Sequence, residues 1–356
     1  MNKKLFKSII LTAQVGTITL FGILYHKLKK GHNKLKINYN DLSSIETVAK
    51  IKDNTTAVDL TKIKRQNIRK IIEDFYYKLE KDPNVDLTNF KKNLQTLKVK
   101  SIKEFEGDSS FAEALYDYYN NTIYYSILVK PRVLGHELLH MASTVYDEEA
   151  KYVRFVGFGQ DKHNKKIGIG LTEGYTELLA KRYFGDINKK DTSDSYVTEM
   201  DLVNSLEKII GKEKMMKLYF RGDLKSLVNE LKKYNDIEKI IEFIHSIDKI
   251  ALDTVNGYNY LTKREYNNYL VNAVEFLIAS YVNKLQTELN ENKIDNDLFM
   301  KKIEEFTNDL NNFDYIKYGI KHRIQLLNKK NLFNILKKVL GSEYISLSTE
   351  KENVKC

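Results

Sequence analysis

The chain has 356 residues, of which 58 are Lys or Arg and 48 are Asp or Glu, so its formal net charge is +10. An apolar fraction of 42% and a charged fraction of 30% exclude an intrinsically disordered composition. The single cysteine is the last residue, Cys356, which excludes a disulfide framework, a cysteine-based zinc finger and a redox pair. Metal ligands elsewhere in the chain must therefore be histidine or carboxylate side chains.

The positive charge is concentrated at the N-terminus. Residues 1–40 hold eight lysines and no acidic residue, which leaves 50 basic and 48 acidic residues in the rest of the chain. Only eight of all the basic residues are arginines, and they form no cluster. A surface that binds nucleic acid usually groups arginines on one face, so we expect no nucleic acid among the partners.

Residues 8–25 form an uncharged, mostly apolar run between two groups of lysines. A helix of this length just spans the hydrocarbon core of a bilayer. No Ala-x-Ala pattern follows it, which favours an uncleaved transmembrane signal-anchor over a cleaved signal peptide or a buried helix. The lysine counts on the two sides nearly balance, but the short charged tail of residues 1–7 favours an N-terminus inside the cell. We therefore expect a single-pass cell-membrane protein with its body on the extracellular side and its flanking lysines near lipid headgroups.

Residues 26–60 are polar and aperiodic, and they are predicted to form a stalk. Helical periodicity begins next, with apolar side chains recurring along one helix face. The sequence Asp82-Pro83-Asn84 ends this helix, a second short helix follows, and residues 97–100 begin a strand. The apolar positions are Ile68, Ile71, Ile72, Phe75 and Leu79 in the first helix, and Phe90 and Leu94 in the second.

The middle of the chain has strand signals. Asn120-Asn121 is typical of a turn, and residues 122–129 form a β-rich run. Residues 152–159 and 166–170 flank a polar turn around residues 161–165, which predicts a β-hairpin. From about residue 171 onwards almost every segment has helical spacing.

The sequence His136-Glu137-Leu138-Leu139-His140 is the most informative part of the chain. Pro131 suits the first turn of a helix that would carry it. On a helix, positions i and i+4 share one face, so His136 and His140 can direct imidazole nitrogens at one metal ion. Glu137 lies next to that face and can act as a general base on a water without being a ligand. The alternative is a surface helix with two incidental histidines.

A third ligand is expected further along the chain. The metzincin pattern requires Gly and His three and six residues after the second histidine, but Ser143 and Tyr146 occupy those positions, so that class is excluded. Glu173 is the candidate, in the first turn of a helix that Thr172 would cap. Glu177 lies one turn further on the same face and can accept an N–H from a ligand histidine.

Other roles for these acidic residues stay open. Glu177 could instead pair with Lys181 at i, i+4. Glu173 could compensate the dipole at the start of its helix. Three further acidic residues, which would be solvated at the end of the histidine-bearing helix, are rival ligand donors: Asp147, Glu148 and Glu149.

The pentapeptide together with Thr172-Glu173-Gly174-Tyr175-Thr176-Glu177 resembles the gluzincin branch of zinc metallopeptidases, over about residues 118–185. The resemblance implies one zinc ion bound by His136, His140 and Glu173, a water activated by Glu137, and a peptide substrate lying along the strand at 120–129. His140 and Glu173 are 33 residues apart, a longer spacing than in the best-known members.

The resemblance also implies a fold and a domain plan. We expect an α+β, mostly helical fold, with a zincin-like metal-binding domain over residues 61–185 that contains a small antiparallel or mixed sheet and an active-site helix. Helical spacing, together with a broad likeness to the C-terminal lobe of such enzymes, predicts a C-terminal helical lobe over residues 186–345, and the polar residues 346–356 are expected to form a flexible tail.

Members of this family usually add a Tyr or His that stabilises the oxyanion. Tyr196 is preferred here, because it lies shortly beyond the ligand helix; the other candidates are Tyr175, Tyr219, His163 and His245. The sequence thus predicts a membrane-anchored zinc metallopeptidase that hydrolyses peptide or protein substrates. The alternative is a membrane-tethered helical interaction protein with a non-catalytic or structural metal site.

Overall fold

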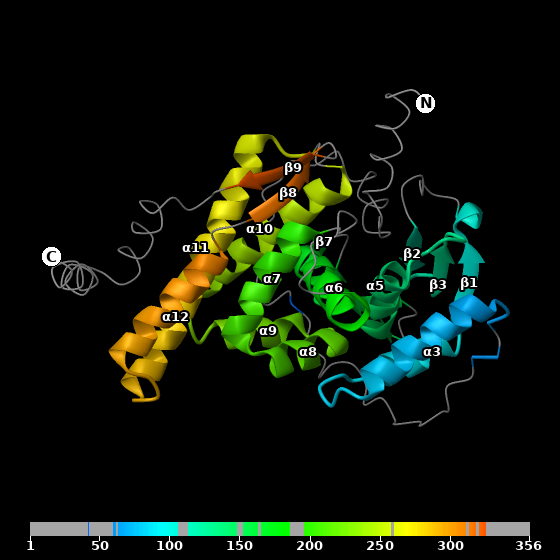
Figure 1. Ribbon diagram of the computed structural model, residues 1–356, viewed down its shortest axis with the longest axis horizontal. Coiled ribbons are helices and arrows are strands. Elements are labelled where there is room, and N and C mark those ends of the chain that lie inside the picture. Colours follow the sequence, from blue (N-terminus) through cyan, green and yellow to red (C-terminus); the bar gives the residue numbers. More distant parts are fainter. Residues whose placement is uncertain are drawn as a thin grey trace.

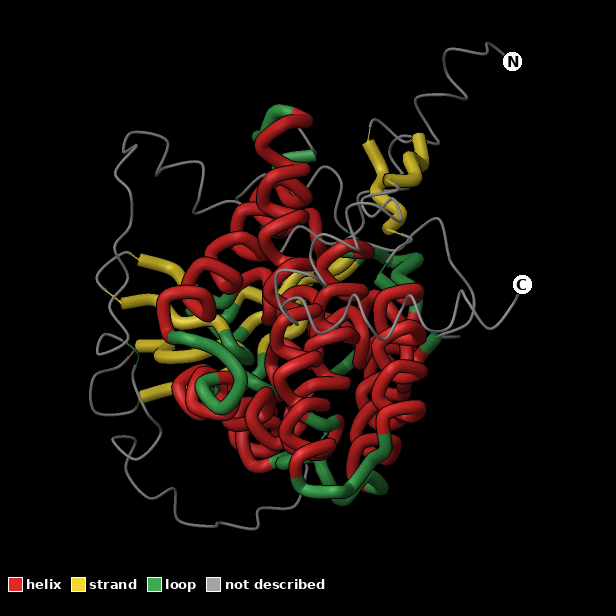
Figure 2. Tube along the Cα trace, turned by 90° about the vertical axis from the view of Figure 1, so that its left-hand side faces the viewer, coloured by secondary structure: helices red, strands yellow, loops and turns green. Residues whose placement is uncertain are grey.

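The computed structural model describes residues 42, 60–61, 63–105, 113–147, 152–162, 165–185, 196–257, 260–310, 313–317 and 320–324. These residues are mostly helical with small sheets, as the α+β prediction requires (Figures 1 and 2). The predicted anchor at 8–25, the tail at 346–356 and most of the predicted stalk lie outside the described residues. Within the described part of the chain, no helix has both the length and the apolar character needed to cross a bilayer.

The N-terminal part pairs two helices with a three-stranded sheet at one end of the molecule (Figure 1). The sheet has the order β1-β3-β2, with β1 parallel and β2 antiparallel to β3. The two helices and the strand start near residue 98 are confirmed, whereas β2 was not predicted. These elements are α3 (Gln66–Glu80), α4 (Thr88–Leu94), β1 (Lys98–Ser101), the 3-10 helix η3 (Ile102–Glu104), β2 (Ala114–Asp117) and β3 (Thr122–Tyr125).

Strand β3 corrects the expectation for residues 120–129 in two ways. It ends at Tyr125, because residues 126–129 form a turn in which Val129 N–H donates to the Ser126 carbonyl over 3.1 Å. It is also the central strand of its sheet, so it cannot be the edge along which a substrate lies. The edge strand beside the histidine-bearing helix is β2.

Helix α5 (Pro131–Ala142) carries the His-Glu-x-x-His sequence, with Pro131 in its first turn as predicted. Every residue from Val133 to Ala142 is buried. Asn93 of α4 holds the end of this helix, since its side-chain amide donates to the carbonyls of Met141 and Thr144, each over 2.9 Å. Strand β4 (Thr144–Asp147) follows at once, so Asp147 lies in a strand and not at a helix end.

The hairpin predicted over residues 152–170 is confirmed in part: two antiparallel strands pair across the predicted turn at residues 161–165, but a second reversal precedes them. Strands β5 (Tyr152–Val156), β6 (Gly159–Lys162) and β7 (Lys165–Ile167) continue antiparallel from β4. The unforeseen turn is at residues 157–158, where Gly157 has φ +56°, a left-handed conformation that glycine adopts without steric cost.

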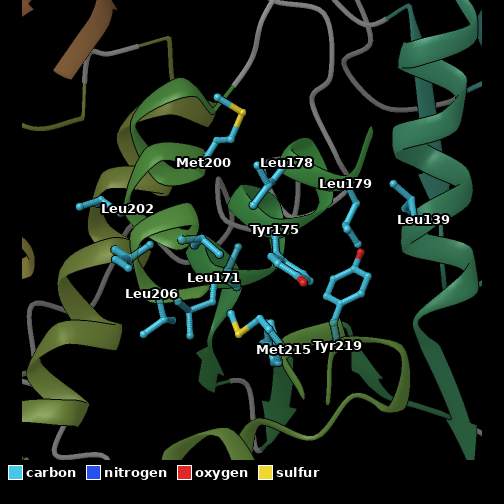
Figure 3. Packing of buried hydrophobic residues seen from close by; sticks show 14 of the residues in the cluster. Leu139, Leu171, Tyr175, Leu178, Leu179, Met200, Leu202, Leu206, Met215 and Tyr219 are labelled. Carbon is cyan, nitrogen blue, oxygen red and sulfur yellow. The ribbon is translucent and has the colours of Figure 1, made fainter. Parts of the chain in front are cut away.

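Helix α6 (Ile169–Phe184) occupies the centre of the molecule and is buried from Ile169 to Lys181. It packs on α5 on one side and on α7 and α10 on another. Figure 3 shows Leu171, Tyr175, Leu178 and Leu179 of α6 among apolar side chains of α5, α7 and α8. The helices after it are α7 (Val197–Ile210), α8 (Lys212–Arg221), α9 (Leu224–Leu231), α10 (Ile237–Val255), α11 (Lys263–Asn290) and α12 (Asn296–Asp309).

The C-terminal part confirms the predicted helical character, with one addition. A hairpin of β8 (Phe313–Lys317) and β9 (Ile320–Ile324) follows α12. Most of the buried apolar residues between Leu42 and Leu310 form one continuous cluster that includes residues of α3, α5, α6 and α10. Helix α6 therefore shares its core with elements on both sides of residue 185.

The start of α6 differs from the prediction. Gly168, with φ +79°, precedes its first turn, and Glu173 falls in the second turn. The side chain of Asp248, on α10, caps the helix by accepting the N–H groups of Gly168 over 2.9 Å and Gly170 over 2.8 Å. Thr172 is inside the helix, where its hydroxyl lies 2.9 Å from the carbonyl oxygen of Gly168. Asp248 makes a local cap unnecessary, because it already satisfies free N–H groups of the first turn.

Candidate metal centre

Helices α5 and α6 bring His136, His140 and Glu173 together in the interior. The two Nε2 atoms of the histidines lie 3.1 Å apart. Oε2 of Glu173 lies 3.4 Å from Nε2 of His136 and 3.3 Å from Nε2 of His140. The three ligand atoms thus form a nearly equilateral triangle, and these residues could hold a metal ion.

The triangle has the size of one face of a tetrahedral site. Metal bonds of 2.0–2.2 Å to nitrogen and oxygen put the ligand atoms of a tetrahedron about 3.3–3.6 Å apart. The observed edges of 3.1, 3.3 and 3.4 Å lie within about 0.2 Å of that range. Three ligands on one face leave a fourth position, which is the arrangement of catalytic rather than structural zinc sites.

Glu137 lies beside this triangle and is itself completely buried. Its Oε2 accepts the backbone N–H of Tyr116, on β2, over 2.8 Å. Its Oε1 has no hydrogen-bond partner among the described residues. Burial raises the pKa of Glu137 to about 8, and the neighbouring Glu173 carboxylate contributes in the same direction. One oxygen is therefore held in place, while the other makes no hydrogen bond with a described residue.

Glu177 lies one turn beyond Glu173 on α6, and its two carboxylate oxygens contact His136 and Arg132. Its Oε2 lies 2.9 Å from Nδ1 of His136, and its Oε1 accepts a hydrogen bond from the Arg132 guanidinium. Burial alone would raise the pKa of Glu177, but the bond to His136 and the charges of Arg132 and Lys181 lower it. Glu177 is thus an ionised partner of His136, a candidate metal ligand, and Lys181 acts on Glu177 through its charge.

Arg132 was not identified from the sequence. It stands four residues before His136, so all three of Arg132, His136 and His140 share one face of α5. The i, i−4 spacing was the available signal, but an isolated arginine at that distance has no meaning until its partner on another helix is known.

Protons compete with a metal ion at this site. Although burial opposes it, the carboxylates of Glu173 and Glu177 raise the pKa of His136 to about 10. Burial lowers the pKa of His140. A metal ion bound at Nε2 of His136 would therefore replace a proton there, and its affinity depends on pH.

Tyr196 is the aromatic side chain that lies against the centre. Its ring is nearly parallel to that of His136, with an interplanar angle of 12° and centroids 6.1 Å apart. It precedes the first turn of α7 with φ 55°, a left-handed conformation that is uncommon for a tyrosine. Such a conformation costs about 1–3 kcal/mol and persists where the surroundings impose it.

The remaining oxyanion candidates contact other groups or lie outside the description, although Tyr219 is near enough to Glu173 and Glu137 for their charges to help raise its pKa, which burial raises most. Tyr175 donates its hydroxyl to Glu207 over 2.7 Å, and the Tyr219 hydroxyl lies 2.6 Å from that of Thr176. The ring of His245 packs against a tyrosine of α11. The position of His163 is outside the described residues, as are those of the rival ligands Glu148 and Glu149.

Three comparisons with known proteins accompany this geometry. No protein-family model, no curated protein and no solved structure matched the chain. The chemistry of the site is accordingly inferred from its own residues and distances. Of the residues predicted for the site, the structure brings together His136, Glu137, His140, Glu173 and Glu177, with Tyr196 stacked beside them.

Proposed function

We propose that the protein is a zinc metallopeptidase of the gluzincin type. The triangle of ligand atoms from His136, His140 and Glu173, with Glu137 buried beside it, is the observation that carries the proposal. Two imidazoles and one carboxylate with one position left over are a typical donor set for catalytic zinc. When bound, zinc would polarise a peptide carbonyl and make a neighbouring water acidic.

Glu137 is the proposed general base. Its free Oε1 can accept a proton from water and later release that proton to the leaving amine. A pKa raised towards neutrality suits a group that must do both at the same pH. The Tyr116 N–H keeps the carboxylate oriented during both transfers.

Strand β2 is the proposed place for the substrate. Its Tyr116 N–H points towards Glu137 and not towards β3, so the outer edge of the sheet faces the general base. An extended peptide lying beside this edge would pass next to Glu137, while the Tyr116 N–H stays bound to the carboxylate. Tyr196 is proposed to stabilise the oxyanion, since its ring already lies against His136.

The proposal includes the cell membrane as the place of action. The uncharged run at residues 8–25 supports a single-pass anchor, and the lysine-rich tail before it supports an extracellular body. Lipid would then be a partner through the N-terminal segment alone.

A second candidate function is favoured by the burial of the ligands. His136, Glu173 and His140 are exposed by 2% or less, as expected of a structural metal site in a membrane-tethered interaction protein. The two candidates differ in what Glu137 does, because a structural site needs no general base.

The experiment that separates them uses the purified full-length chain. We expect about one zinc per chain by elemental analysis, loss of that zinc in His140→Ala, and its retention in the control His245→Ala. Glu137→Gln should keep the zinc and lose hydrolysis of a mixed peptide library. Wild type without zinc would refute the zinc site, and a zinc-bound Glu137→Gln as active as wild type would refute the catalytic role.

A further inference from the structure

The facing sides of α5 and α6 carry alternating basic and acidic groups. Arg132, His136 and His140 follow one another at intervals of one turn on α5, and Glu173 and Glu177 do so on α6. Glu177 lies between Arg132 and His136, and Glu173 lies between His136 and His140. Arg132 is therefore the end member of the row that contains all three metal ligands.

Arg132 occupies the oxygen of Glu177 that the histidine does not use. Oε1 of Glu177 accepts from the guanidinium, while Oε2 accepts from Nδ1 of His136 over 2.9 Å. A proton on Nδ1 leaves the lone pair of that imidazole on Nε2, which faces Glu173 and His140. With both oxygens bound, the carboxylate plane cannot rotate without breaking one of these contacts.

The charges of the centre give Arg132 a second effect. Three carboxylates are buried together: those of Glu137, Glu173 and Glu177. The guanidinium of Arg132 is bonded to Glu177, and its charge, together with that of Lys181, favours the ionised form of this carboxylate. The side chain of Arg132 is 12% exposed and that of Glu177 is 3% exposed, so water screens this pair weakly.

We propose that Arg132 is a positioning residue of the metal centre, which acts through Glu177 to hold His136 in its ligand orientation. The proposal rests on the proposed zinc site and adds to it a residue that touches neither the metal nor the substrate. Hydrogen-bond partners of ligand histidines typically change metal affinity by about 10- to 100-fold when they are removed.

The chain offers a matched control on α6 itself. Arg182 binds Glu207 of α7 through two nitrogens, at 2.6 and 2.8 Å, and the two side chains are 18% and 8% exposed. This is also an arginine–glutamate pair between two helices, but no metal ligand takes part in it. Loss of either arginine should lower the melting temperature, whereas only loss of Arg132 should change metal binding.

The test measures the zinc dissociation constant of the full-length chain by competition with a chelator, together with the visible spectrum of its cobalt(II) form. We expect Arg132→Gln to bind zinc about 10- to 100-fold more weakly and to alter the cobalt spectrum. Arg182→Gln should stay within about threefold of wild type with an unchanged spectrum. Arg132→Lys should recover most of the affinity, because lysine keeps the positive charge and an N–H donor for Glu177.

A double-mutant cycle decides whether Arg132 acts through Glu177. Once Glu177→Gln has removed the carboxylate, adding Arg132→Gln should weaken zinc binding little further. Fully additive effects, or an Arg132→Gln variant with the affinity of Arg182→Gln, would overturn the role of Arg132 and leave the zinc site standing. A wild-type chain that binds no zinc would overturn both proposals.

Discussion

Gly174 follows the proposed ligand Glu173 on α6 and allows α7 to pass very close. A Cβ atom at this position would lie 2.6 Å from the carbonyl oxygen of Glu199 and 2.7 Å from its carbonyl carbon. Ordinary contacts of a Cβ atom begin near 3.4 Å, and these neighbours are backbone atoms that no rotamer change can move. Gly174→Ala should therefore force α6 and α7 apart by about 0.8 Å, the gap between 2.6 and 3.4 Å.

Two opposing effects set the size of the loss. Alanine in place of glycine favours the helix by about 1 kcal/mol. Overpacking against a rigid neighbour costs about 1–3 kcal/mol, and the backbone contact places this site at the upper end. We expect a net destabilisation of about 1–2 kcal/mol. Because ligand distances tolerate only about 0.2 Å, the shift of Glu173 should also weaken zinc binding by about tenfold or more.

Urea unfolding of the metal-free chain and chelator competition measure the two effects separately. Gly211→Ala is the control: nothing lies within 4 Å of its Cβ, but its φ of +95° strains any side chain. It should lose about 1–3 kcal/mol of stability and keep the zinc affinity of wild type. A Gly174→Ala chain with wild-type stability and wild-type zinc affinity would refute the close packing of α6 on α7.

Three further predictions concern the site and its surroundings. Burial raises the pKa of Glu199 from 4.5 to about 7, so the folded chain binds the proton of this carboxyl group more tightly than the unfolded chain does. The stability that this proton contributes is full below pH 4.5 and is lost as the pH rises through 7. In chelator, the unfolding free energy of wild type relative to Glu199→Gln should fall by up to about 1.4 kcal/mol per pH unit between pH 5 and 7, and parallel curves would contradict this. Tyr196→Phe should lower kcat about 100-fold with zinc content unchanged. A variant with the kcat of wild type would show that another group stabilises the oxyanion. Zinc at about 100 times its Kd should raise the unfolding free energy of wild type by about 2.7 kcal/mol and leave His140→Ala unaffected, and an equal response of both would place the ion elsewhere.

Much of the site could be predicted from the sequence, because the i, i+4 rule concerns residues of one and the same helix. It put His136 and His140 on one face of α5, and it put Glu173 and Glu177 on one face of α6. The helical periodicity at residues 68–79 worked for the same reason, because one apolar face packs against one core. The domain division at residue 185 and the transmembrane anchor stay predictions.

What the sequence did not reveal depends on pairs that are distant along the chain. Strand β2 exists through its pairing with β3, and no alternation of apolar residues announced it. Asp248 caps α6 from a helix far along the chain, so the local rule chose Thr172 instead. Arg132 had the right spacing but no visible partner. The turn at Gly157 was missed because a single glycine between β-rich residues also fits a continuous strand.

The cap on α6 has a consequence for the order of events during synthesis. Helix α6 supplies Glu173, but N–H groups at the start of this helix, which have no partner within the helix, donate to Asp248. The ribosome must therefore add the whole stretch from residue 174 to residue 248 before the group that anchors this helix exists. Until then the two histidines of α5 can meet a metal ion only without a fixed third ligand. A nascent chain should thus hold zinc weakly until α10 has docked, which ties full loading of the centre to the folding of the C-terminal helices.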